Sequence, residues 1–430
     1  MPPSKLYQWL QSTKLLLRAK QYADVVLVMG NEAADLDSVV SSIAYAYLRE
    51  AQSRSSSTIA TTQPHNTLHL PLIAIPRSEF QLRTECTFAL KTAYQNDDIS
   101  SVLTFADEID LQSLTQPPTS LSVILTDHNS LASTYSVLAP HITGIIDHHA
   151  DSHHHPTADP RIISVVGSCT TLVVNEWQKA IQSSNPTTTT DPLATYLTPS
   201  LATLLLSPIL IDTIDLNPSF YRATPQDITA TQFLLPYLQN PTYTTLESAQ
   251  PYFTSFFTAL QKAKLEISHL PTPSLLIKDH KQWTFKCTTT NQSITVGISS
   301  VMFPLRGTNG WISRENSATP IIKAATTFAQ ERNLDLLIIM TAFDHAEAAA
   351  VGEDEAGAKG FQRELIPIFN PGFVISHPDE TRKIVERLER SELELVKFQE
   401  VDGASLYVQN NVKCSRKQVQ PIVQGICEGL

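Results

Sequence analysis

The sequence predicts the α/β fold class, with an N-terminal parallel sheet crossed by helices and a smaller C-terminal α/β domain. Two observations lead to this prediction. Apolar runs of strand length, such as 24–29, alternate with helical stretches, which is the pattern of a parallel sheet with crossover helices. The length of 430 residues is too great for one compact core and suits two domains. We place the domains at 1–222 and 223–430.

The N-terminal half begins with its clearest strand signal. Residues 24–29 (Asp-Val-Val-Leu-Val-Met) read as a buried parallel strand, followed by a turn at 30–34 and a helix over 37–50. Further strand-like apolar runs are expected at 70–75, 121–126, 142–146 and 201–211. In such sheets ligands bind beyond the carboxyl ends of the strands, so the polar residues that follow these runs are the candidates for a site.

The C-terminal half carries fewer signals. Strands are expected at 294–301 and 334–340, and a charged helix at 379–398. Segments 51–64 and 183–192 are rich in Ser and Thr and are typical of surface loops.

The net charge of -11 argues against sequence-independent binding of nucleic acid, which requires a basic face. The charge is uneven, because residues 1–270 hold 14 Lys and Arg against 23 Asp and Glu. An acidic N-terminal half suits divalent cations, and an anionic substrate would need a local basic site, which is more plausible in the C-terminal part.

No apolar stretch reaches the roughly 18 residues of a membrane span, so no membrane association is expected. The N-terminal segment is amphipathic and lacks the features of a signal peptide. The five cysteines are scattered without CxxC spacing, which is typical of reduced thiols. We therefore expect a cytoplasmic protein.

Aspartates follow four of the apolar runs. They lie in the segments Asn31–Ser38, Asp127–Asn129, Asp147–His149 and Asp212–Thr213. Any single Asp in such a place is as often an ordinary helix cap. Four of them at strand ends, together with a double His, form a converging anionic cluster that is costly to desolvate alone. Two hard divalent cations would neutralise it, and carboxylate and imidazole ligands suit Mn²⁺ or Mg²⁺.

With Asp147-His148-His149 as its centre, this ordered set of motifs resembles the DHH phosphoesterase superfamily. The same order occurs in manganese-dependent family II pyrophosphatases and in fungal cytosolic exopolyphosphatases. Near the C-terminus, Ser415-Arg416-Lys417-Gln418-Val419 with Pro421 is similar to the signature of the DHH-associated domain of these two groups. Asp279-His280-Lys281 with Trp283 resembles another basic motif of that domain.

The resemblance implies two divalent cations, Mn²⁺ or Mg²⁺ and possibly Co²⁺, and assigns residues to them. Their ligands would be Asp35, Asp37, Asp127, His148 and Asp212, with Asp127 shared by both cations. His149 would face the substrate phosphate and serve in proton transfer. Lys281, Arg416 and Lys417 would bind phosphate oxygens from the second domain.

Asn31 stands where family II pyrophosphatases carry His, and an amide is a poorer metal ligand than imidazole. At that position the chain resembles the exopolyphosphatase branch, as do Ile75-Pro76-Arg77 and the nearby Arg83. Arg77 is therefore a further candidate for substrate binding. The turn 167–171 resembles a shared turn before a helix, where its amides would meet phosphate or serve an ordinary helix cap.

The implied function is a monomeric exopolyphosphatase that hydrolyses the terminal phosphoanhydride bond of inorganic polyphosphate or shorter polyphosphates and releases orthophosphate. Metal-activated water would attack the terminal phosphorus in line, with basic side chains stabilising the charge. Three alternatives stay open: an inorganic pyrophosphatase or nucleoside polyphosphate hydrolase, a Prune-like adaptor with weak phosphodiesterase activity, and a DHH nuclease. Asn31 argues against the pyrophosphatase, and the intact ligand set argues against the adaptor. The acidic charge balance argues against the nuclease.

Two other groups of polar residues are more ordinary. The run His153–His155 follows the Asp-His-His motif, but His runs beside Pro are more often solvated than metal-binding. Glu353–Glu355 lies in a Gly- and Ala-rich stretch and is expected to be a surface loop.

Overall fold

The computed structural model describes residues 2–55, 67–183, 192–238, 240–288, 292–344 and 360–430. The chain divides into two compact units, Met1–Lys264 and Leu265–Leu430. The expected segment Glu353–Glu355 lies outside the described residues, as do most of the expected loops at 51–64 and 183–192.

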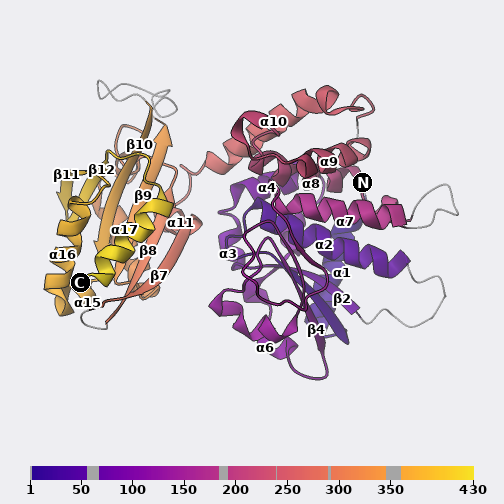
Figure 1. Ribbon diagram of the computed structural model, residues 1–430, viewed down its shortest axis with the longest axis horizontal. Helices are drawn as coiled ribbons and strands as arrows, with labels where there is room; N and C mark the ends of the chain where they lie inside the picture. The colour runs from indigo at the N-terminus through magenta and orange to yellow at the C-terminus, as the bar shows by residue number, and fades with distance from the viewer. Residues whose placement is uncertain (1, 56–66, 184–191, 239, 289–291, 345–359) are drawn as a thin grey trace. The chain divides into compact units, whose positions relative to one another are not determined.

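A six-stranded, all-parallel sheet forms the centre of the first unit, in the order β3-β2-β1-β4-β5-β6 (Figure 1). Its strands are β1 Asp24–Met29, β2 Thr67–Ile73, β3 Thr104–Phe105, β4 Ser120–Thr126, β5 Ile142–Asp147 and β6 Arg161–Ile163. The expected parallel sheet is confirmed, and the run at 24–29 is β1 without change. The sheet order reverses between β1 and β4, because the chain builds outward from β1 on both sides.

Ten α-helices are described in the first unit. They are α1 Lys5–Ala19, α2 Leu36–Ser55, α3 Arg77–Phe80, α4 Thr84–Ala93, α5 Ile99–Val102, α6 Leu111–Leu114, α7 Cys169–Ser183, α8 Pro199–Asp212, α9 Pro225–Leu234 and α10 Leu246–Leu265, the last residue of which belongs to the second unit. None of the helices described in the chain is long and apolar enough to cross a membrane.

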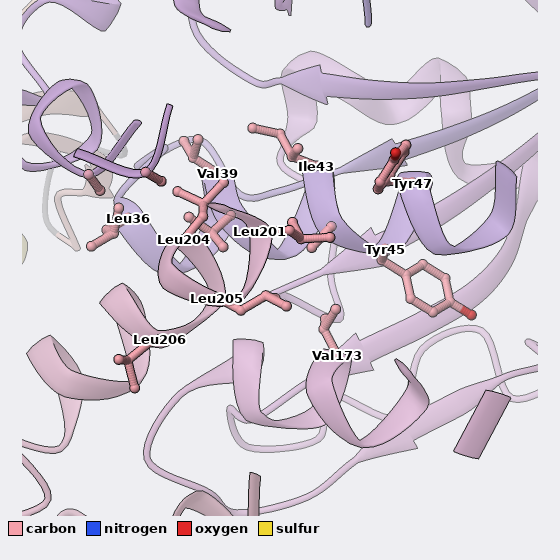
Figure 2. Close-up of a cluster of buried hydrophobic side chains, with 14 of the residues drawn as sticks. Leu36, Val39, Ile43, Tyr45, Tyr47, Val173, Leu201, Leu204, Leu205 and Leu206 are labelled. Carbon is pink, nitrogen blue, oxygen red and sulfur yellow. The ribbon is translucent and has the colours of Figure 1, made fainter. Parts of the chain in front are cut away.

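Both faces of this sheet are buried, as its near-continuous apolar strands require. Val28 of β1 packs in one core with α2, α7 and α8, whereas its neighbours Leu27 and Met29 pack in a second core on the other face. Figure 2 shows part of the first core, where Val39 and Ile43 of α2 lie beside leucines of α8. This packing fixes the start of α2, and with it Asp37, against the sheet.

The run 201–211 is not a strand, contrary to its strand-like appearance in the sequence. It forms α8, whose N-cap Thr198 accepts a hydrogen bond from the amide of Leu201. Residues 201, 202 and 204–211 are buried, so this helix is apolar on almost every side. A fully buried helix lacks the polar face that gives the 3.6-residue period, so its sequence looks like that of a buried strand.

The first unit extends past the boundary at 222 that the sequence indicated. Helices α9 and α10 pack on the first unit, with Ala230, Leu234, Phe253 and Leu260 in the same core as α2 and α8. The compact units therefore divide at 264/265 rather than at 222/223.

The second unit is a smaller α/β unit with a six-stranded mixed sheet in the order β11-β12-β10-β9-β8-β7. Its strands are β7 His280–Lys286, β8 Ser293–Val301, β9 Leu336–Asp344, β10 Phe361–Phe369, β11 Leu395–Val401 and β12 Ala404–Gln409. Its helices are α11 Thr272–Lys278, α12 Trp311–Arg314, α13 Thr319–Glu331, α15 Pro371–Ser376, α16 Pro378–Glu389 and α17 Arg416–Glu428.

Helices cover both faces of this second sheet. Ile298 of β8 packs in one core with α16 and α17, whereas the hydroxyl of the adjacent Ser299 donates to the carbonyl of Leu276 in α11. Successive side chains of a strand point to opposite faces, so α11 lies on the face opposite α16 and α17.

The prediction of a helix over 379–398 is correct only for the first part of that range. α16 ends at Glu389, and β11 begins at Leu395 and pairs with β12. Glu394, just before β11, adopts a left-handed conformation (φ 54°) that one continuous helix over 379–398 would not contain.

Candidate metal centre

The candidate residues gather at the carboxyl ends of β1, β4 and β5, which are neighbours at the centre of the first sheet. Asn31 follows β1, Asp127 follows β4, and Asp147 ends β5. The sheet order reverses between β1 and β4, and open α/β sheets bind ligands at such a switch point. The fold therefore brings together residues that are about 100 positions apart in the sequence.

Asp127 lies at the middle of this group, and its backbone is in the left-handed region (φ 64°). Its Oδ2 atom accepts hydrogen bonds from the Ser38 hydroxyl (2.6 Å) and from the Asn31 side-chain amide (2.9 Å). Its Oδ1 atom is buried without a hydrogen-bond partner, although Nε2 of His148 lies 3.2 Å away. Burial, and next the charge of Asp37, raise the pKa of Asp127 to about 7.

His148 is oriented as a metal-binding imidazole is. Its Nδ1 atom lies 3.1 Å from the carbonyl oxygen of Val166, so Nδ1 carries the proton and Nε2 carries the lone pair of the neutral ring. Nε2 points toward Oδ1 of Asp127 and lies 3.8 Å from Oδ2 of Asp37. Burial lowers the pKa of His148, but the carboxylates of Asp127 and Asp37 outweigh burial and raise it to about 10.

Asp37 is held by the start of α7, a part of the chain more than 130 residues away. Its carboxylate accepts hydrogen bonds from the amides of Cys169 (2.6 Å) and Thr170 (2.8 Å). The hydroxyls of Ser168 (2.8 Å) and Thr170 (2.7 Å) also donate to it. A helix N-terminus favours an anion, and here the anion is this side chain. The turn at 167–171 thus caps α7 with Asp37, and these two amides are not directed at a substrate phosphate.

Asp35 and Asp212 complete the group of carboxylates. Burial, followed by the charge of Asp37, raises the pKa of Asp35. Burial raises the pKa of Asp212 well above its usual value, and the charges of Asp37 and Asp35 add to this effect. Each carboxylate therefore experiences the negative charge of its neighbours.

This donor set fits divalent cations. Oδ1 of Asp127 and Nε2 of His148 lie 3.2 Å apart in a buried position, so a proton or a cation is needed between them. Among the described residues, Asp127, His148 and His149 have ligand atoms that all lie within 4.8 Å of one another. Carboxylates with one or two imidazoles suit Mn²⁺ and Mg²⁺.

His149 has a different role from His148. Its Nδ1 atom lies 2.8 Å from Oδ1 of Asp147, and its side chain is 57% exposed. Asn129 donates an amide hydrogen bond to the other oxygen of Asp147. The hydrogen bond to Asp147 is the largest effect on His149 and raises the pKa of the imidazole. A protonated, oriented and accessible imidazole can donate a hydrogen bond or a proton to an anionic ligand.

Asn31 acts on Asp127 in this structure. Its side-chain amide donates to Oδ2 and to the carbonyl of Asp127, and its Oδ1 atom accepts from the amide of Ala33 (2.8 Å). The side chain therefore orients the carboxylate that the family resemblance implies as the shared ligand of two cations.

Arg77 is tied into the first unit by its own contacts. Its guanidinium makes two hydrogen bonds to Glu108 (2.7 and 2.9 Å) and lies over the ring of Phe105. The carbonyls of Ser100 and Leu103 accept hydrogen bonds from Nη1 and Nη2. With every nitrogen of the group engaged, these contacts favour a structural role over the predicted contact with substrate.

In the second unit, Arg416 begins α17 and contacts the segment that leads into β7. Its guanidinium lies 2.7 Å from a carboxylate oxygen of Asp279 and donates to the carbonyl of the same residue. Lys281 and Lys417 are exposed. In the sequence, Lys281 lies two residues after Asp279 and Lys417 directly follows Arg416. His153 and His154 of the first unit are exposed, and neither belongs to a group of metal-ligating atoms found among the described residues.

Sequence reasoning missed the residues that hold the ligands. Asp147 and Asn129 orient His149, Ser38 holds Asp127, and Thr170 holds Asp37. Asp147 and Asn129 stand beside the metal-ligand candidates in two of the motifs, which was the only signal for them. The contact of Asp37 with α7 joins distant segments and has no signature in a single sequence.

Comparison with known families agrees with this fold. Residues 25–209 match the DHH family, N-terminal domain, and residues 258–426 match the DHHA2 domain. The chain belongs to the DHH phosphoesterase superfamily.

Among individual relatives, the human protein named Exopolyphosphatase PRUNE1 is 28% identical over 423 residues, which cover 97% of this chain and 78% of the relative. A Schizosaccharomyces pombe protein, provisionally named as an exopolyphosphatase, is 29% identical over 418 residues, which cover 96% of this chain and 94% of the relative. A solved structure from Methanococcus jannaschii, provisionally described as a family II inorganic pyrophosphatase, is 18% identical with a TM-score of 0.45 and covers 94% of this chain and all of its own.

Proposed function

We propose that the chain is an exopolyphosphatase that hydrolyses the terminal phosphoanhydride bond of inorganic polyphosphate with the help of two divalent cations. The observation that carries this proposal is the buried carboxylate of Asp127, whose Oδ1 atom has no hydrogen-bond partner within the described part of the chain and lies 3.2 Å from Nε2 of His148. The names of the human and fission-yeast relatives support polyphosphate as the substrate.

Asp35, Asp37, Asp127, His148 and Asp212 would hold the cations. When bound, the two cations supply an acidified water near neutral pH and neutralise charge on the phosphate. The chain fixes the ligands beforehand, because Asn31 and Ser38 hold Asp127 and the start of α7 holds Asp37. Ligands that are already oriented lose little entropy when a cation binds.

His149 would serve the substrate rather than the cations. Asp147 occupies its Nδ1 atom, which leaves Nε2 for a phosphate oxygen. The hydrogen bond to Asp147 raises the pKa of His149 and so favours the protonated ring, whose Nε2–H can stabilise negative charge or deliver a proton.

Lys281, Arg416 and Lys417 of the second unit would bind the polyphosphate chain. Arg416 suits bidentate phosphate contacts, and the two lysines add mobile positive charge. Asp279 limits the mobility of the Arg416 guanidinium before substrate arrives. Remote contacts of this kind would favour a long polyanion over pyrophosphate. We further expect a monomer located in the cytoplasm.

The test is phosphate release from long-chain polyphosphate, tripolyphosphate and pyrophosphate, each with Mg²⁺, Mn²⁺ or Co²⁺. Polyphosphate should be the best substrate, and a chelator should abolish turnover. Asp127→Asn should lower kcat at least a thousandfold, because it removes the charge of the shared ligand at constant volume. Asp151→Asn is the matched control, since Asp151 pairs with Arg161 and is absent from the group of metal-ligating atoms found in the described part of the chain.

Two outcomes would contradict the proposal. An Asp127→Asn variant with wild-type turnover and metal content would remove the metal assignment. If the protein hydrolysed pyrophosphate but not polyphosphate, the result would support the pyrophosphatase alternative instead.

A further inference from the structure

A short left-handed turn follows the candidate ligand Asp212 at the end of α8. Ile214, Asp215 and Leu216 all have positive φ angles, at 54°, 60° and 56°. The amide of Asp215 donates to the carbonyl of Leu210 (2.8 Å), so the turn closes the C-terminus of the helix. The chain thus reverses its handedness directly after the residue that would bind a cation.

Three successive residues in this region are unusual and costly. Residues other than glycine enter the left-handed region singly, at about 1–2 kcal/mol for each residue, and a β-branched residue such as Ile214 is a true outlier there. Conformations of this kind persist only where the surrounding structure determines them, and they cluster at functional sites.

The carboxylate of Asp215 holds this turn to α10. Its Oδ2 atom accepts hydrogen bonds from the Thr254 hydroxyl (2.6 Å) and from the Gln250 side-chain amide (3.0 Å). Its Oδ1 atom is buried without a hydrogen-bond partner. Asp215 is therefore a partly desolvated carboxylate that the proposed reaction does not use.

We propose that Asp215 is a positioning residue of the metal centre, which aims Asp212 at the cations by fastening the left-handed turn to Gln250 and Thr254 of α10. This inference rests on the proposed function, because it requires Asp212 to be a ligand. Asp212 is the last residue of α8, so the direction of its carboxylate depends on how the chain leaves the helix. Partners that orient metal ligands typically change metal affinity 10- to 100-fold.

The contact can be removed from either side. Asp215→Ala deletes the acceptor, and the double variant Gln250→Leu with Thr254→Val deletes both donors while Asp215 stays in place. Thr258→Val is the matched control, because it removes a hydroxyl one turn further along α10 whose hydrogen bond, within the described ranges, goes to the carbonyl of Thr254. Asp212→Ala is the positive control for loss of a ligand.

The measurement is Mn²⁺ affinity by titration calorimetry of the metal-free full chain, with phosphate release recorded as Mn²⁺ is raised. We expect Asp215→Ala and the α10 double variant each to weaken Mn²⁺ binding about tenfold, and saturating Mn²⁺ to restore most of kcat. Their combination should weaken binding no further than either alone, because both break the same contact. Thr258→Val should match the wild type.

Wild-type Mn²⁺ affinity in the folded α10 double variant would overturn the inference, even if Asp215→Ala did not fold. Fully additive losses would overturn it as well. If Asp212→Ala itself bound Mn²⁺ as tightly as the wild type, the proposed function would fail, because Asp212 would not be a ligand.

Discussion

Asn31 lies at the candidate metal centre, where its side-chain amide contacts Asp127. Its two donor contacts to Asp127 fix the carboxylate, and its oxygen is occupied by the amide of Ala33. An imidazole at this position would give up these contacts and offer a nitrogen ligand instead.

We therefore expect Asn31→His to bind Mn²⁺ more tightly and to raise pyrophosphatase activity relative to exopolyphosphatase activity. Pyrophosphate lacks the remote charges that a long chain offers to the second unit, so it gains most from a firmly held cation. The measurement is the ratio of the two activities across Mn²⁺ and Mg²⁺ titrations. Asn96→His, at an exposed position, is the control, and an unchanged ratio in Asn31→His would place substrate choice elsewhere.

Glu108 gives a prediction about pH. Arg77 and Lys14 donate to its carboxylate, and although burial acts in the opposite direction, these contacts lower its pKa from 4.5 to about 2. A lowered folded-state pKa stabilises the protein above pH 4.5, and this stabilisation disappears as the pH falls toward 2. Glu108→Gln should therefore cost about 1–2 kcal/mol at pH 7 and progressively less below pH 4.5.

Urea unfolding at several pH values measures this difference. Arg77→Ala should show the same loss of stability, while its KM for polyphosphate stays at the wild-type value. A raised KM in an equally stable Arg77→Ala variant would instead support the substrate contact that the sequence suggested.

At the scale of elements, the start of α9 supports the start of α7. The carboxylate of Asp227 accepts hydrogen bonds from the amide of Gly167 (2.9 Å) and from the hydroxyls of Thr171 and Thr224. The next residues of the same turn hold Asp37. A residue beyond the matched DHH segment therefore supports the candidate metal centre through two turns of chain.

Asp227→Asn should destabilise the first unit by about 2–3 kcal/mol, because the buried carboxylate accepts several charge-assisted hydrogen bonds that an amide cannot all replace. Thermal and urea unfolding of the full chain measure the loss. The control is Asp110→Asn, an exposed cap of α6 that should cost less than about 1 kcal/mol. Equal effects of the two substitutions would mean that Asp227 is an ordinary cap.

The elements also show what the sequence could and could not reveal. The strands that end near Asn31, Asp127 and Asp147 were predictable, because parallel strands are short apolar runs that end in polar residues. The helical state of α8 was not, since burial on all sides removes the helical period. Nor was the role of Arg77, because the contacts that engage its guanidinium come from chain 23–31 residues away.

At the scale of the whole molecule, the division at 264/265 can be tested by truncation. The chain 1–264 should fold cooperatively, because α9 and α10 complete its core with Ala230, Leu234, Phe253 and Leu260. The chain 1–222 should melt at a lower temperature and bind a hydrophobic dye, since it exposes the apolar surface that these helices cover.

Circular dichroism melts and dye fluorescence of the two truncated chains measure this difference. Chain 265–430, with its own core, is the control and should fold in both comparisons. If 1–222 melted as cooperatively and at the same temperature as 1–264, the boundary expected from the sequence would be the better one.

The edge strands of the two sheets differ in length, which bears on whether copies of the chain can add to one another strand by strand at high concentration. The first sheet ends in strands of two and three residues, which offer little backbone to another molecule. The second sheet ends in β7 and β11, each seven residues long and each paired with one strand among the described residues. Lysines on such a border discourage intermolecular strand addition, and β7 carries Lys281 and Lys286. We therefore expect Lys281, proposed to bind phosphate, also to discourage fibrillar aggregation.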